Sequence, residues 1–182
     1  RYHPYQFIPL FERNGFITEV DFCVLDQTCA LLRRRLDSGL PVFPISVNQS
    51  RLHLQEEGYL QRLTEMVKRH QVPPNLIELE LTETAFNGLE RLDELAKQLK
   101  KIGFLLSLDD FGSGYSSLSL LGGFPLDTIK LDRTFMDRAL SSSRSQTIVQ
   151  KVVELAHEMG ILVICEGVEL PEQARFLLQI GC

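Results

Sequence analysis

The chain has 182 residues, of which 44% are hydrophobic and 24% are charged, and its formal net charge at pH 7 is −5. This composition is typical of a globular domain with a buried core and excludes a disordered or fibrous chain. The negative charge argues against a partner that is a nucleic-acid polymer, although a small anionic substrate stays possible if metal ions screen it. The longest apolar run, Ile161 to Cys165, is far shorter than the roughly 18 residues of a membrane span.

The cysteines show neither a C-x-x-C spacing nor the density of a disulfide scaffold. We predict that all four are reduced and buried: Cys23, Cys29, Cys165 and Cys182. The histidines fall outside the predicted strand ends and show no metal-ligand spacing, so none is assigned chemistry: His3, His53, His70 and His157. The first residue is Arg1 rather than Met, and we expect the chain to be a piece of a longer polypeptide.

Five stretches rich in β-branched and aliphatic residues predict strands, and segments with helical periodicity separate them. The strands are expected at Pro44–Asn48, Ile77–Leu81, Leu105–Asp109, Thr128–Leu131 and Leu162–Glu166. Three apolar stripes at helical spacing run over residues 17–32, 89–102 and 148–159, the last with Ser143 as its expected cap, and a further helix is expected to begin at Pro171. This alternation is typical of βα units in a parallel sheet, within one domain spanning residues 1–182.

Polar residues interrupt these strands at or near their C-terminal ends, where a strand buried on both faces should be apolar. They are Asn48, Glu80, Glu83, Asp109, Asp110, Lys130, Asp132 and Glu166. The C-terminal ends of parallel strands meet at one edge of the sheet, which is where reactive sites are built. Burying several carboxylates there is costly without a cation. Oxygen ligands of this kind select Mg²⁺ or Mn²⁺, and the adjacent Asp109 and Asp110 could serve two ions, as in phosphate-ester hydrolysis.

The alternative is that each acid caps a following helix, which is plausible for any one of them and poor for all of them together. Lys130 has three interpretations: a counter-charge to the acids, a stabiliser of a phosphate and its attacking water, or a Schiff-base nucleophile as in barrel aldolases. Surrounding carboxylates would keep the amine of Lys130 protonated, which disfavours the nucleophile. The glycine-rich segment 111–117 after the two aspartates is either a lid or a simple turn.

Together these segments resemble the EAL domain family of cyclic di-GMP phosphodiesterases. The resemblance rests on Ser46-Val47-Asn48-Gln49-Ser50, Glu78-Leu79-Glu80-Leu81-Thr82-Glu83, Asp109-Asp110-Phe111-Gly112-Ser113-Gly114-Tyr115-Ser116-Ser117-Leu118, Ile129-Lys130-Leu131-Asp132 and Glu166-Gly167-Val168-Glu169, in this order and spacing. Phe7-Ile8-Pro9-Leu10 and Gly181-Cys182 fit as well.

The resemblance implies a variant (β/α)8 barrel of the TIM type that hydrolyses cyclic di-GMP to linear pGpG with two Mg²⁺ or Mn²⁺ ions. Asn48, Glu80 and Asp109 would hold one ion, and Asp109 with Asp110 the second. Lys130 would orient the attacking water, and Glu166 would be a metal neighbour or general base, with Glu169 supporting the ligands from outside. Glu83 would anchor the loop that contains Gly112, Gly114 and Tyr115, which is linked to dimerisation and activity.

The resemblance also implies what lies around the chain. The Glu-Ala-Leu strand that names the family would come just before Arg1, and the final strand would follow Cys182, so we expect an incomplete barrel. A homodimer, a diguanylate-cyclase-like or sensory domain in the parent chain, and a cytoplasmic location, with a parent that could be membrane-anchored, are further expectations. The alternatives are a catalytically silent cyclic di-GMP receptor or protein-interaction module, and an aldolase-like enzyme that uses Lys130.

Overall fold

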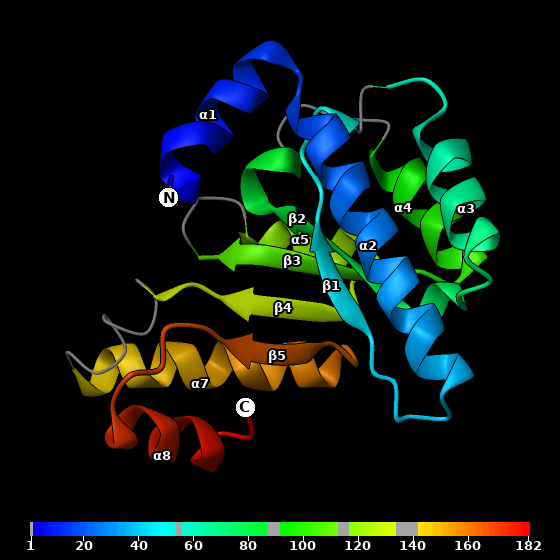
Figure 1. The fold of residues 1–182 in the computed structure, drawn as a ribbon. Helices are drawn as coiled ribbons and strands as arrows, with labels where there is room; N and C mark the ends of the chain where they lie inside the picture. Colours follow the sequence, from blue (N-terminus) through cyan, green and yellow to red (C-terminus); the bar gives the residue numbers. More distant parts are fainter. Residues whose placement is uncertain (1, 54–55, 87–91, 113–116, 134–141) are drawn as a thin grey trace. The chain divides into compact units, whose positions relative to one another are not determined.

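The computed structural model describes residues 2–53, 56–86, 92–112, 117–133 and 142–182 (Figure 1). They form two compact units: the first comprises residues 1–81 and 88–105, and the second comprises residues 82–87 and 106–182, apart from the gaps given above. The expectation of one domain over residues 1–182 stays a prediction. No helix among the described residues is long and apolar enough to cross a membrane.

The first unit is a two-stranded parallel sheet with helices. Its elements in chain order are α1 (Pro4–Asn14), α2 (Ile17–Asp37), β1 (Ile45–Asn48), α3 (Tyr59–Arg69), the short 3₁₀ helix η2 (Pro74–Leu76), β2 (Ile77–Thr82) and α4 (Leu92–Ile102). Strand β1 pairs with β2 in parallel. Helix α2 packs on β1 and lies beside α3 (Figure 1).

The core of the first unit joins the apolar stripe of α2 to that of α3 and to β2. Leu25 and Leu63 are fully buried on the two helices, and Ile77 is fully buried at the start of β2. Buried residues recur at helical spacing along α2 and along α3, so one face of each helix is removed from water. This burial holds the C-terminal ends of β1 and β2 side by side.

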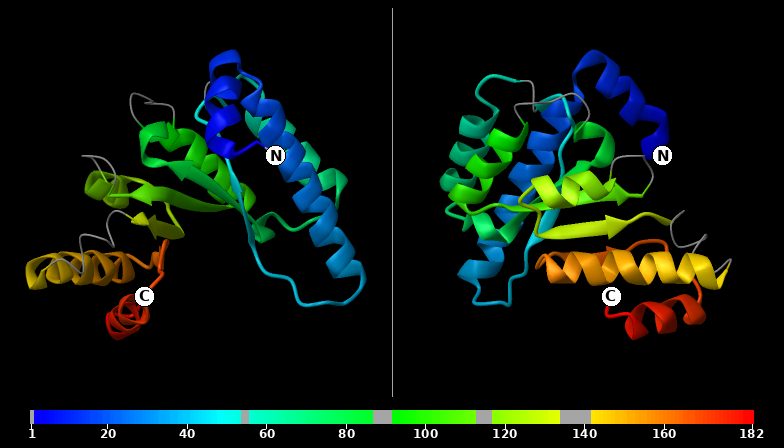
Figure 2. Two further views of the ribbon diagram at one scale, coloured as in Figure 1. Left: turned by 60° about the vertical axis from the view of Figure 1, so that its left-hand side comes forward. Right: turned by 180° about the vertical axis from the view of Figure 1, so that it is seen from behind.

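The second unit is a three-stranded parallel sheet. Its elements are the 3₁₀ helix η3 (Glu83–Phe86), β3 (Leu105–Phe111), α5 (Ser117–Gly123), β4 (Thr128–Leu131), α7 (Ser143–Glu158), β5 (Leu162–Cys165) and α8 (Pro171–Gln179). Strand β4 pairs with β3 and with β5, in parallel in both cases. The arrows of the three strands point to the same side in Figure 1, so their C-terminal ends share one edge. Helix α8 lies beside α7 in all views (Figures 1 and 2).

The sequence predicted these elements closely, and the structure corrects their ends: β1 begins at Ile45 rather than Pro44, and β2 continues to Thr82 rather than ending at Leu81. Strand β3 continues to Phe111, two residues past its expected end at Asp109, and β5 ends at Cys165 rather than Glu166. The cap of α7 is Ser142 rather than Ser143, because the Ser142 hydroxyl accepts a hydrogen bond from the Ser145 amide. An N-cap hydroxyl satisfies one of the amides that the first turn leaves without a partner.

The cysteine prediction was correct about the thiols and wrong about their burial. All four cysteines are free, but Cys29 alone is buried, whereas Cys23 is exposed and Cys165 and Cys182 are partly exposed. Cys23 lies on the outer face of α2, where the apolar stripe of that helix does not extend.

Candidate functional site

The first unit places two of the predicted site residues directly opposite each other. Asn48, the last residue of β1, is in register with Glu80 of β2. The Gln49 amide then donates to the Glu80 carbonyl at 2.9 Å, which fixes the backbone just past Asn48. Glu80 is buried, at 5% exposure, whereas Asn48 is exposed. An amide and a carboxylate from adjacent strands thus lie at one end of this sheet.

A buried polar network holds the segment that follows Asn48. The Asp21 carboxylate on α2 accepts from the Ser50 amide at 2.8 Å and lies 3.1 Å from His53 Nε2. His53 is fully buried, and its ring packs at an edge against Phe22. The Tyr59 hydroxyl donates to Gln49 Oε1 at 2.8 Å. Burial raises the pKa of Tyr59 far above its usual range, so this hydroxyl stays protonated and remains a donor.

Sequence reasoning missed this network. Asp21 lies inside a helical stripe, and His53 has no spacing that distinguishes it from a surface histidine. The available signal was Asp21 on the same helical face as the buried Phe22 and Leu25, because a carboxylate near a buried face needs a partner.

In the second unit, a distortion of β3 produces the adjacent acid pair. The register between β3 and β4 shifts between Leu108 and Phe111. Asp110, which lies in this stretch, has a φ of +57°, in the left-handed region that Asp tolerates better than most residues. Its amide donates to the Asp109 carboxylate at 2.9 Å. Bulges of this kind re-aim side chains next to active sites.

The charges at this edge act on one another. Burial raises the pKa of the Asp109 carboxyl, and the nearby Asp110 and Glu166 carboxylates add to the rise, while Lys130 opposes it. Burial also raises the pKa of Asp110, with further contributions from Asp132 and Glu166 and again an opposing one from Lys130. Lys130 Nζ lies 3.1 Å from Glu166 Oε1. The second unit therefore brings together Asp109, Asp110, Lys130, Asp132 and Glu166, as predicted from their strand-end positions.

The backbone at Gly167, directly after Glu166, lies close to the side chain of Arg133. The Glu166 amide donates to the Leu131 carbonyl at 3.1 Å. Gly167 has a φ of +67°, and a Cβ at this position would lie 2.8 Å from Cβ of Arg133. The Arg133 guanidinium pairs with the Glu169 carboxylate at 2.9 Å. Glu169 thus braces the segment beyond Glu166, and its predicted supporting role stays a prediction.

The residues predicted to control the loop are only partly described. Glu83 begins η3 and is buried, at 4% exposure. Gly112 follows β3 with a φ of +92°, a conformation that favours glycine. Gly114 and Tyr115 lie outside the described residues.

The alternative that each acid caps a following helix is not supported by the five α-helices whose N-cap residues are described. The N-caps of α1, α2, α3, α7 and α8 are His3, Phe16, Gly58, Ser142 and Leu170. None of them is a predicted site residue.

A divalent cation fits the donor set chemically. Within the described part of the chain, no three acidic, histidine or cysteine side chains already converge as a ready cation site. However, the raised pKa values of Asp109 and Asp110 show that their edge disfavours further negative charge, which a hard cation would relieve. Carboxylate and amide oxygens are the ligands that Mg²⁺ and Mn²⁺ prefer.

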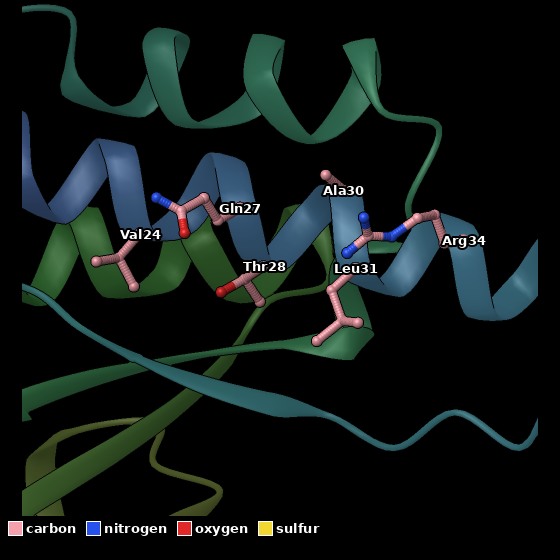
Figure 3. Close-up of a pocket in the computed structure, with 6 residues that line it drawn as sticks. All are labelled: Val24, Gln27, Thr28, Ala30, Leu31 and Arg34. Atoms are coloured by element: carbon pink, nitrogen blue, oxygen red, sulfur yellow. The ribbon is translucent and has the colours of Figure 1, made fainter.

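A hollow of about 490 Å³ lies over α2 and is unrelated to these acids (Figure 3). It is lined by Val24, Gln27, Thr28, Ala30, Leu31 and Arg34. None of these side chains is acidic and none is a predicted site residue, so the hollow is not a candidate for metal chemistry.

The sequence of the chain is similar to a known protein family and to characterised bacterial signalling proteins. The model of the EAL domain family matches residues 1–182. The chain is 36% identical over 180 residues to the bifunctional diguanylate cyclase/cyclic di-GMP phosphodiesterase MucR of Pseudomonas aeruginosa, covering 98% of this chain and 26% of MucR. It is 32% identical to the cyclic di-GMP phosphodiesterase RocR of the same organism, covering 98% of this chain and 46% of RocR. The chain thus spans less than half the length of these relatives.

The solved structures agree on the fold. The MucR phosphodiesterase in complex with cyclic di-GMP matches with a TM-score of 0.89 at 36% identity, covering 98% of this chain and 73% of that one. The FimX EAL domain matches with a TM-score of 0.91 at 22% identity, covering 100% and 73%. The described strands and these neighbours define an α/β protein built as an incomplete TIM-type barrel with polar residues at its C-terminal strand ends. The chain belongs to the EAL domain family.

Proposed function

We propose that this chain is the catalytic domain of a metal-dependent phosphodiesterase that hydrolyses cyclic di-GMP to linear pGpG in bacterial signalling. The observation that carries the proposal is the edge of the second unit, where burial and mutual repulsion raise the pKa of Asp109 and Asp110 beside the Lys130–Glu166 pair. The names of MucR and RocR supply the substrate. The identity of 36% with MucR and of 32% with RocR supports the same chemistry in this chain.

We propose Asn48, Glu80, Asp109, Asp110 and Glu166 as metal ligands. Two Mg²⁺ or Mn²⁺ ions, when bound, would polarise the phosphodiester and lower the pKa of the attacking water. The pairing of Asn48 with Glu80 keeps two oxygen donors at adjacent strand ends. The bulge in β3 supplies two more donors from consecutive residues. Oxygen donors on strands, rather than on loops, keep ligand positions well defined.

Lys130 and Glu166 are the proposed catalytic residues. The Lys130 ammonium carries positive charge to the place where an anionic phosphate would sit, and it orients the attacking water and stabilises the phosphate charge. Glu166 holds the ammonium in place at 3.1 Å and is available to accept a proton from the water. A lysine held beside carboxylates stays protonated, so the aldolase-like alternative is not favoured.

A silent receptor is the second candidate. The observation that favours it is that no three metal-binding side chains already converge among the described residues. Such a module would bind cyclic di-GMP without cleaving it.

The deciding experiment is turnover of cyclic di-GMP by the purified protein, with pGpG measured by chromatography in Mg²⁺, in Mn²⁺ and in a chelator. Metal-dependent pGpG supports the enzyme, and Asp109→Asn should then abolish it at saturating substrate. Asp37→Asn, on the exposed end of α2, is the matched control and should keep full activity. Binding without pGpG in either metal would instead establish the receptor.

We further propose that the protein works as a homodimer within a longer chain. The segment that contains Gly112, Gly114 and Tyr115, anchored by Glu83, would connect dimerisation to activity. Because the chain covers 26% of MucR, a diguanylate-cyclase-like or sensory domain has room in a parent of similar length. Sedimentation of the protein with and without cyclic di-GMP tests the dimer, and a monomer at all concentrations would reject it.

A further inference from the structure

Two thiols of the second unit face each other at the ends of adjacent elements. Cys165 is the last residue of β5, and Cys182 follows the C-terminal end of α8. Their sulfur atoms are 3.2 Å apart, and both side chains are partly exposed. Such contact between two cysteines from different elements brings together groups that oxidation can join.

The position of Cys182 is fixed by the end of its own helix. Gly181 takes a left-handed conformation with a φ of +86°, and the Cys182 amide donates to the Leu177 carbonyl at 3.0 Å. This is the arrangement of a Schellman motif, which turns the chain back over the last helical turn. The Cys182 thiol also donates to the Val163 carbonyl of β5 at 3.4 Å. The backbone of Cys182 is therefore held by its own helix α8, and its sulfur is held by strand β5.

The other two cysteines have no such arrangement. Cys29 is fully buried, and burial raises the pKa of its thiol to about 11, so it is a poor nucleophile. Cys23 is exposed, and its sulfur accepts a hydrogen bond from Gln27 at 3.3 Å rather than facing a thiol. Among the four cysteines, Cys165 and Cys182 are the pair whose sulfurs are in contact.

We propose that Cys165 and Cys182 are a modification site, a dithiol that a peroxide oxidises reversibly to a disulfide joining the end of α8 to β5. The disulfide closes a loop of the chain between residues 165 and 182. Its first cysteine, Cys165, directly precedes Glu166. The disulfide requires the sulfurs to approach by roughly 1 Å, to the covalent distance of about 2.05 Å.

The chemistry balances with peroxide as the oxidant. The Cys182 thiolate attacks one peroxide oxygen and the O–O bond breaks, which gives a Cys182 sulfenic acid and a hydroxide that takes up the proton released by the thiol and leaves as water. The Cys165 sulfur then attacks the sulfenic sulfur, the S–O bond breaks, and a second water leaves with the Cys165 proton. The hydrogen bond from the Cys165 thiol lowers the pKa of Cys182, which favours the thiolate at this sulfur. A thiol reductant reverses the reaction.

Peptide mapping tests the site directly. Trypsin cleaves after Lys151 and Arg175, so the two cysteines fall on separate peptides, whereas Cys23 and Cys29 share one. After treatment of the purified protein with hydrogen peroxide and alkylation of free thiols, we expect a non-reduced digest to join the peptide with Cys165 to the one that begins at Phe176. Dithiothreitol should separate them. Four alkylated cysteines after treatment, or a bridge to Cys23, would overturn the proposal.

Thermal unfolding tests whether the disulfide joins α8 to β5 in the folded state. Oxidation should raise the Tm by at least about 3 °C, because the closed loop restricts the unfolded chain. Cys182→Ser and Cys165→Ala should show neither the cross-link nor the Tm rise, while Cys23→Ser should show both. A cross-link formed with no change or a fall in Tm would show that the thiols are joined only after local unfolding, and it would reject the site as described.

Discussion

Lys130 Nζ on β4 and Glu166 Oε1, directly after the neighbouring strand β5, lie 3.1 Å apart. Lys130 is in register with Ile164, so Glu166 lies two residues further along the chain and on the same face as Ile164. The lysine side chain is 14% exposed and the glutamate side chain 48%. Lys130 is therefore the more buried partner of the pair, and its ammonium places one positive charge near Asp109 and Asp110.

Lys130→Met should lower cyclic di-GMP hydrolysis by about 10²-fold or more, because it removes the charge that would stabilise the phosphate while keeping a similar apolar stem. Turnover at saturating substrate is the measurement. Lys151→Met is the matched control, since Lys151 pairs with Glu154 on the exposed face of α7. Turnover by Lys130→Met within about threefold of the wild type would remove Lys130 from the proposed machinery.

Asp109→Asn should stabilise the metal-free protein while abolishing its activity. In the unfolded chain Asp109 titrates near its ordinary pKa of 3.8, whereas burial raises its pKa in the folded protein. Below about pH 3.8 both states are protonated and the carboxyl costs nothing. As the pH rises through the raised pKa, the folded state must carry a half-buried charge, and the wild type loses stability relative to the variant. The side-chain amide oxygen of the variant can still accept from the Asp110 backbone amide.

Because solvent screens a half-buried carboxylate, we expect a gain of only about 0.5 kcal/mol at pH 7.5, or roughly 1–2 °C in Tm. Differential scanning calorimetry in a chelator, at several pH values, measures it. The gain should shrink toward pH 4. Mn²⁺ should stabilise the wild type more than the variant, reversing the order. A variant less stable than the wild type at pH 7.5 without metal would contradict the raised pKa.

The sequence predicts the strands well because their signal is local. Ile129 and Leu131, for example, are fully buried apolar residues within the four-residue strand β4. The acids were predictable as a set because carboxylates at the ends of apolar strands conflict with burial unless they have a function. Their pairing across strands, as between Asn48 and Glu80, follows from parallel register once the strands are known.

What the sequence could not show is local geometry that depends on the fold. The bulge at Asp110 has no glycine to mark it, since a non-glycine residue takes the left-handed conformation there. The Asp21–His53 contact joins residues 32 positions apart, and no spacing rule relates them. The contact between Cys165 and Cys182 likewise depends on how α8 ends against β5.

Gly167→Ala should destabilise the protein and misplace Glu166. An alanine Cβ would lie 2.8 Å from Arg133 Cβ and Cγ, and its φ of +67° is unfavourable for a side chain. We expect a loss of about 2–3 kcal/mol in the free energy of unfolding, from strain and steric overlap together. Hydrolysis should fall at least about tenfold, because the residue before the clash is Glu166.

Gly160→Ala is the control that separates backbone strain from steric overlap as causes of the lost stability. Gly160 has a similar φ of +74°, but a Cβ there meets no atom within 4 Å. It should cost about 1 kcal/mol from strain alone and leave hydrolysis unchanged. Urea unfolding of the two variants measures the difference, and equal losses would show that the approach of Arg133 does not constrain the backbone at Gly167.

Asp21→Ala should destabilise the protein through the segment that follows Asn48. The substitution leaves the Ser50 amide and the buried His53 ring without the carboxylate they share. An unsatisfied buried polar group costs about 1–3 kcal/mol, so we expect a loss in this range by urea unfolding. Because Ser50 is two residues from Asn48, cyclic di-GMP hydrolysis should also fall at saturating metal by at least about threefold.

Asp26→Ala is the matched control on the same helix. The Asp26 carboxylate also meets a histidine, His70, at 2.8 Å, and it pairs with Arg69, but its side chain is 43% exposed. Solvent replaces these contacts, so the loss should stay at about 1 kcal/mol or less, with hydrolysis unchanged. If Asp21→Ala costs no more than Asp26→Ala, the buried network does not anchor the end of β1, and Asn48 is positioned by its pairing with Glu80 alone.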